Sequence, residues 1–190
     1  MRLGPTFDML SWRRASFGQV VIAELGDGSA PRSHRLPLSR LGSIVSHMST
    51  QNERVAGILG LSVGKSAAEP MYLARAVERG LPVRALTRVF DAIASDEPRL
   101  RYAVVPRATF ARKQNDGSTL SPEQSDRVVR IARLWAMAIE VWHDEEAARA
   151  FLLRPHPLLE GERPIDVART TEGARLVEGV LGRLQHGTSV

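Results

Sequence analysis

This chain of 190 residues contains no cysteine, few aromatic residues and no long apolar run. The absence of cysteine excludes disulfides, cysteine nucleophiles and zinc ribbons, and it suits a reducing compartment. No segment approaches the roughly 18 consecutive apolar residues that a membrane span needs, and the first residues lack the charged-then-apolar layout of a signal peptide. With aromatic residues at 5%, Leu, Val, Ile and Ala must form the core. We expect a cytoplasmic protein without a membrane partner.

Motifs that mark common enzymes and metal sites are missing as well. The stretch GLSVGKS at 60–66 places three residues between Gly60 and Gly64, whereas a phosphate-binding loop needs four. Glu140 and His143 have the i, i+3 spacing of one half of a carboxylate-bridged metal pair, but the sequence offers no second half. The five histidines have no accompanying nucleophile motif such as GxSxG. We therefore expect no enzyme activity, no cofactor and no metal ion.

Charge is unevenly distributed along the chain, whose net charge is +5. Residues 71–120 carry nine Lys and Arg against five Asp and Glu, whereas residues 121–190 carry nine against eleven. A basic middle followed by an acidic end favours two partners of different character, a polyanion and a protein. An ordinary arginine-rich surface would give the same counts.

The apolar pattern is helical from residue 71 onward and predicts an all-α fold. Gly80 is expected to end one helix, and the turn signal Asn115-Asp116-Gly117 is expected to end another. The clearest helix starts with a capping box at Ser121-Pro122-Glu123-Gln124, and its inward stripe is Val128, Ile131, Ala132, Trp135, Ala138, Ile139 and Trp142. Asp144 is the expected N-cap of the next helix. We predict a peripheral or poorly ordered extension over 1–70 and two helical domains over 71–120 and 121–190.

The basic segment from Arg99 to Lys113 holds five basic residues and no acidic one. Two short helices, EPRLRYAVV and PRATFARKQNDG, joined at Val105-Pro106, fit a helix-turn-helix, whose second helix enters the major groove of DNA. We expect Ala108, Phe110 and Ala111 to pack inward, and the DNA-binding residues to be Arg107, Thr109, Arg112 and Lys113. Arginine can read guanine edges and lysine can neutralise phosphate. A solvated basic helix pair inside a helical bundle fits the pattern equally.

The stretch AFLLRPHPLLEGERPIDV at 150–167 predicts a shaped connector. Its prolines end one helix after Leu153, Gly161 allows a turn, and Pro164 can start a new helical segment. His156 is expected to hydrogen-bond the loop backbone.

A last helix should follow this connector, with Gly187 as its stop. We expect its inward residues to be Val177, Val180, Leu181 and Leu184. Gly173, Gly179 and Gly182 would each cost about 1 kcal/mol relative to alanine in a helix. Close approach to a neighbouring helix is the expected reason for these glycines.

Four motifs occur in order over the second half of the chain: LSPEQSDRV, DEEAARAFL, RPHPLLEGERPIDV and TTEGARLVEGVLGRLQHG. With them, the sequence from about Val77 to its end resembles the Xre/MbcA/ParS family of antitoxins. Residues 1–70 carry none of this resemblance.

The resemblance implies a dimeric antitoxin with an Xre-type helix-turn-helix domain that represses its own operon by binding operator DNA. It also implies a C-terminal domain that binds a RES-domain toxin acting on NAD. The extreme C-terminus, which would obstruct the active-site cleft of the toxin, corresponds here to His186, Gly187, Thr188, Ser189 and Val190. The alternative is a stand-alone helix-turn-helix transcriptional regulator whose C-terminal domain dimerises or binds another protein.

Overall fold

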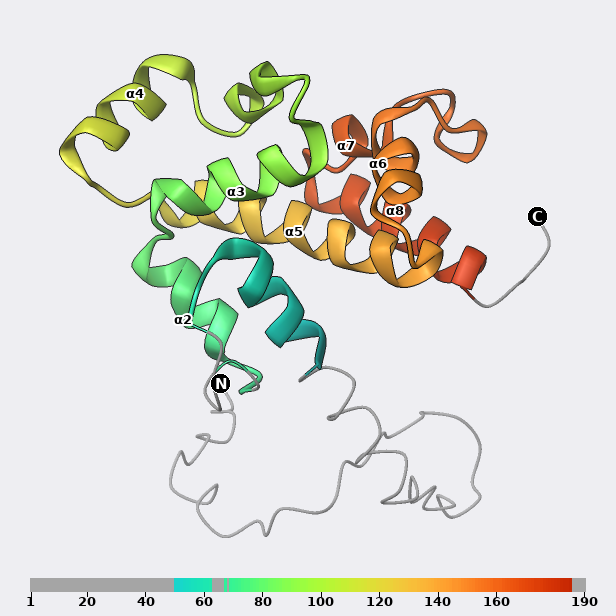
Figure 1. The fold of residues 1–190 in the computed structure, drawn as a ribbon, viewed down its shortest axis with the longest axis horizontal. Helices are drawn as coiled ribbons and strands as arrows, with labels where there is room; N and C mark the ends of the chain where they lie inside the picture. The colour runs from blue at the N-terminus through green and yellow to red at the C-terminus, as the bar shows by residue number, and fades with distance from the viewer. Residues whose placement is uncertain (1–49, 63–66, 68, 186–190) are drawn as a thin grey trace, which may run out of the picture. The chain divides into compact units, whose positions relative to one another are not determined.

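The computed structural model describes residues 50–62, 67 and 69–185, and every regular element among them is helical. The all-α prediction is therefore confirmed (Figure 1). An unlabelled helix spans 50–59. The labelled elements that follow are α2 (Tyr72–Arg79), α3 (Val83–Ala94), η3 (Pro98–Ala103), α4 (Arg107–Asp116), α5 (Pro122–Trp142), α6 (Glu145–Leu153), η4 (Pro157–Leu159), α7 (Pro164–Val167) and α8 (Thr171–Gln185).

Helix α5 lies in the middle of the described fold, and α2, α3, α6 and α8 all pack against it (Figure 1). The predicted capping box forms at its start: the Ser121 hydroxyl accepts from the Gln124 N–H, and the Ser121 N–H donates to the Gln124 side chain. The predicted stripe from Val128 to Ala138 is buried, and Ile139 and Trp142 are half-buried. Most of the core is built around this helix.

The helix over 50–59 is a difference from the sequence expectation. Its residues Val55, Ala56 and Leu59 are fully buried, and Val55 and Leu59 belong to the same core as α5. The expectation of a peripheral segment is therefore wrong for these ten residues, because their apolar side chains are buried by distant parts of the chain. The described structure does not cover 1–49.

Hydrogen bonds join the segment before α3 to the segment before α5 and to the first turn of α5. Gly80 ends α2 with a positive φ of 81°, and a Cβ there would lie 2.4 Å from the carbonyl oxygen of Leu120. The Leu120 N–H donates to the Leu81 carbonyl oxygen at 2.8 Å. The buried Ser125 hydroxyl, one turn into α5, accepts from the Leu81 N–H at 2.9 Å.

Two arginines attach the C-terminal helices to the region around α3. Arg149 of α6 donates from Nε to the carbonyl oxygen of Ala92, near the end of α3, and lies over the Trp135 ring. Arg163, which precedes α7, pairs with Glu97 before η3 and with Asp166. The hydrogen bonds that Arg163 donates to the carboxylates of Asp166 and Glu97 raise the pKa of the Arg163 guanidinium.

The contact between Ser125 and Leu81 generates a stability prediction. Ser125→Ala leaves the buried Leu81 N–H without its acceptor, and we expect unfolding to become easier by about 1–3 kcal/mol in urea denaturation. The control is the exposed Ser95, whose hydroxyl donates to its neighbour Asp96 and to no other described residue. Ser95→Ala should change stability by no more than about 0.5 kcal/mol. Equal effects of the two substitutions would contradict the role of the buried bond.

Candidate binding surfaces

The basic segment forms the turn that the sequence predicts, with a difference in its first helix. η3 is a 3-10 helix that begins at Pro98, and the Leu100 and Val104 N–H groups donate three residues back. Such helices are short because their hydrogen-bond geometry is strained. Val104 and Val105 in the turn are buried, and α4 starts directly after Pro106. The turn is thus anchored in the core, whereas most of α4 is exposed.

Helix α4 touches the core through a single buried residue, Phe110. The Phe110 ring meets Tyr102 edge to face, with 6.0 Å between the ring centroids, and Arg101 lies at 6.0 Å from the same centroid. Ala108 and Ala111, which were expected to pack inward, are exposed. That expectation is wrong because α4 packs against the core through the Phe110 side chain alone.

The four residues predicted to bind DNA differ in their exposure. Arg107 and Arg112 are exposed, whereas Thr109 and Lys113 are half-buried. The Lys113 ammonium donates to the Thr119 carbonyl oxygen. The structure brings all four onto α4 but leaves the two arginines as the more accessible cations.

Arg112 has one partner in the described structure, Asp116, at 3.5 Å. Ser118, whose backbone N–H donates to the Asp116 carboxylate at 2.9 Å, holds the pKa of Asp116 below its usual value, and Arg112 and Lys113 act in the same direction. Both members of the pair are exposed, so the pair contributes little to stability. The Arg112 guanidinium is therefore accessible to solvent.

The C-terminal connector has the shape that its prolines and glycine predict. α6 ends at Leu153 and α7 begins at Pro164. His156 Nδ1 accepts from the Leu158 N–H at 3.3 Å, and the His156 N–H donates to the Glu162 carbonyl oxygen at 3.1 Å. The expected backbone role of His156 is confirmed. Its ring also meets Phe151 edge to face.

Helix α8 follows this connector and is buried on one side. Val177, Val180 and Leu181 are buried as expected, but Leu184 is 43% exposed and Leu176 is 62% exposed. The expectation for Leu184 is wrong because the last turn of α8 extends past the core. The predicted toxin-binding residues 186–190 and the expected helix stop at Gly187 lie outside the described residues.

The glycines of α8 have different surroundings. A Cβ on Gly173 would lie 1.9 Å from the Val167 carbonyl oxygen, so the close approach expected there is confirmed, although its partner is the end of α7. A Cβ on Gly179 or Gly182 would meet no atom within 4 Å, so the expectation is wrong for these two.

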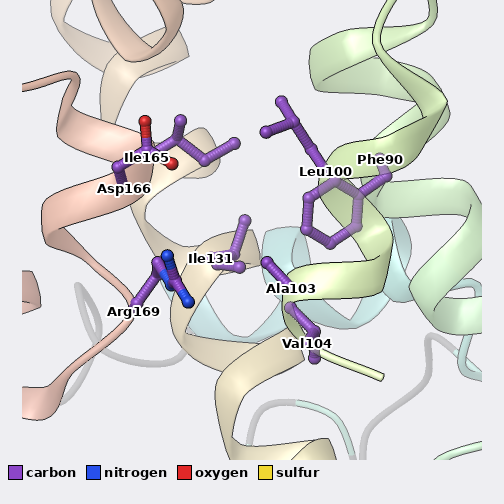
Figure 2. Close-up of a pocket in the computed structure, with 8 residues that line it drawn as sticks. All are labelled: Phe90, Leu100, Ala103, Val104, Ile131, Ile165, Asp166 and Arg169. Carbon is purple, nitrogen blue, oxygen red and sulfur yellow. The ribbon is translucent and has the colours of Figure 1, made fainter. Parts of the chain in front are cut away.

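The cavity in Figure 2 lies where η3 and α3 meet α5 and α7. Its volume is about 20 Å³, and Phe90, Leu100, Ile131 and Ile165 line it together with Arg169 and other residues. This space suits about one water molecule and is far below the several hundred Å³ of ligand pockets. The cavity is therefore too small to hold a cofactor.

The residues of the half metal motif are engaged elsewhere. Glu140 accepts from Arg54 and from Gln185, and His143 ends α5 with a left-handed φ of 52°. Within the described ranges, no three His, Asp or Glu side chains lie close enough together to hold a metal ion. None of the helices described there combines the length and the hydropathy of a membrane span.

Comparison of the sequence with known families identifies two domains of one class of protein. Residues 73–133 match the antitoxin Xre-like helix-turn-helix domain, and residues 137–187 match the antitoxin Xre/MbcA/ParS C-terminal toxin-binding domain. The chain is therefore a helix-turn-helix protein with a C-terminal toxin-binding domain, and the two matches together cover more than half of it. It belongs to the Xre/MbcA/ParS family of antitoxins.

Individual relatives agree with this family. The chain is 27% identical over 130 residues to "Prs ADP-ribosylating antitoxin" of Sphingobium sp., a match that covers 63% of this chain and 82% of the relative. It is 28% identical over 89 residues to "Antitoxin Xre" of Yersinia enterocolitica, covering 46% and 60%. It is 23% identical over 128 residues to "Antitoxin Xre" of Photorhabdus laumondii, covering 66% and 86%.

The environments of the α8 glycines give a paired prediction. Gly173→Ala would force a Cβ against the Val167 carbonyl oxygen, and we expect a loss of stability of about 1–3 kcal/mol from overpacking. Gly179→Ala is the matched control in the same helix. It should raise stability by up to about 1 kcal/mol because alanine is the better helix former and the space is open. Thermal unfolding of the two variants measures both effects, and a loss at both positions would contradict this account.

Proposed function

We propose that this antitoxin neutralises a RES-domain toxin that acts on NAD, and that it represses its own operon by binding operator DNA as a homodimer. The observation that carries the proposal is the order of the two family matches on one helical scaffold, with the basic helix α4 in the first and the connector and α8 in the second. On this proposal the protein acts in the cytoplasm, where it meets both the toxin and the operator DNA.

Toxin inhibition on this proposal needs no chemistry from the antitoxin. The buried side of α8 fixes that helix on α5, and residues His186–Val190 obstruct the active-site cleft of the toxin. The excess of acidic over basic residues in 121–190 complements a basic cleft that binds NAD. The name of the Sphingobium relative includes the term ADP-ribosylating, and ADP-ribosyl transfer consumes NAD. This name supports an NAD-acting toxin as the partner.

Removing the tail tests this mechanism. Deletion of His186–Val190 should leave the melting temperature unchanged, because the deleted residues follow the last core residue of α8, Leu181. Co-expression with the RES-domain protein encoded beside this chain should then arrest growth, whereas the full chain should protect the cells. The truncated chain should still bind that protein in a pull-down.

Full protection by the truncated chain would remove the tail mechanism and leave inhibition by docking alone. The absence of any RES-domain gene beside this one would favour the stand-alone regulator.

DNA binding on this proposal uses the outward face of α4. Arg107 and Arg112 supply the charge that phosphates and guanine edges attract. The exposed Ala108 and Ala111 are small enough to let the helix approach the groove, and a methyl group can contact the thymine methyl. A homodimer would present two such helices to half-sites about one turn of DNA apart.

The prediction for DNA concerns Arg112. Arg112→Ala should weaken binding to the DNA upstream of the operon, by about 1–3 kcal/mol if Arg112 contacts a base. If Arg112 contacts phosphate, the loss should be similar for all sequences and the salt dependence should fall by about one unit. Arg175→Ala is the control, since Arg175 is an equally exposed arginine on α8 that pairs with Glu172. The absence of any mobility shift with this DNA, with and without toxin, would contradict the repressor function.

A further inference from the structure

The last turn of α8 has little to hold it. Leu181 is the last fully buried residue of the helix, and Arg183, Leu184 and Gln185 are exposed. Within the described structure, this turn makes one side-chain hydrogen bond, from Gln185 Nε2 to Glu140 Oε1 at 3.3 Å. The turn that leads into residues 186–190 is thus fixed by a contact with α5.

Glu140 uses both of its oxygens in this arrangement. Its Oε2 accepts from Arg54 Nη1 at 2.9 Å, while its Oε1 accepts from Gln185. The side chain is 23% exposed, so it is partly shielded from water. One carboxylate therefore joins the helix over 50–59, the end of α5 and the end of α8.

We infer that Glu140 is a positioning residue for toxin inhibition: it fixes the last turn of α8, which immediately precedes residues 186–190 in the chain. Arg54 holds the carboxylate in place from the other side. This role rests on the proposed function, since it concerns the tail that is proposed to obstruct the toxin. It also gives the helix over 50–59, which precedes both family matches, a part in inhibition.

The physical argument is one of conformational freedom. The final carbonyl groups of a helix have no partner within it, and exposed ends fray at little free-energy cost. A frayed last turn of α8 must be ordered when the toxin binds, and this ordering weakens binding. The Glu140–Gln185 bond removes part of that cost in the free protein. Because Arg54 is half exposed, the same network contributes little to global stability.

A side-chain exchange tests the role in the full chain. Gln185→Glu places a second carboxylate beside Glu140 and should weaken inhibition of the neighbouring RES-domain protein, measured by NAD consumption, about two- to tenfold. The double variant Glu140→Gln with Gln185→Glu restores an amide opposite a carboxylate and should return inhibition to within about twofold of the wild type. The melting temperature should stay the same in both.

A control variant separates position from charge. Gln114→Glu adds the same negative charge at an exposed position on α4, and it should leave inhibition unchanged. Hydrogen exchange of the free chain gives an independent readout. The amides at the end of α8 should exchange faster in Gln185→Glu and recover in the double variant.

The outcomes separate this role from the proposed function. If the double variant inhibits as poorly as Gln185→Glu, or if exchange at the end of α8 does not respond, the positioning role is overturned. If the wild-type chain fails to inhibit the RES-domain protein, the proposed function is overturned and the positioning role falls with it. Exchange that still responds would then identify Glu140 as a structural clamp alone.

Discussion

The burial of α5 on several sides is the constraint on which the other elements depend. Helices α2, α3, α6 and α8 each lay an apolar side on it, and Ser125 at its start ties down the backbone before α3. Because the interior is close-packed, a shift of α5 would disturb all of these contacts together. The position of α8 therefore depends directly on α5, and the position of α4 depends on α5 through α3.

Local signals in the sequence predict most of the helix ends. The capping box at Ser121, the N-cap Asp144 and the backbone role of His156 all involve partners within six residues, and such contacts can be read from spacing alone. The helix over 50–59 could not be predicted in this way, because Val55 and Leu59 are buried only by residues that are distant in the sequence. The same holds for Gly173, where the obstacle is the end of α7, and for Gly179, where there is none.

The candidate surfaces show the same division. The sequence places Arg107, Thr109, Arg112 and Lys113 on one helix, but their exposure depends on how Phe110 docks α4, which no pattern in α4 specifies. Glu140 is the sharper case. Its spacing to His143 suggests half of a metal site, whereas its partners are Arg54 and Gln185, 86 and 45 residues away along the chain. Spacing cannot reveal a contact of that kind. The roles of the four α4 residues and of residues 186–190 remain predictions.

The continuity of α5 restricts how such a protein can be recombined. The two family matches meet between residues 133 and 137, in the middle of a helix that runs unbroken from Pro122 to Trp142. A crossover at that junction would have to rejoin two half-helices at a point where Leu134, Trp135 and Ala136 are all buried in the core. Exchange of the DNA-binding part between relatives should therefore succeed at the exposed turn of His143 and Asp144, with the whole of α5 inherited as part of that module.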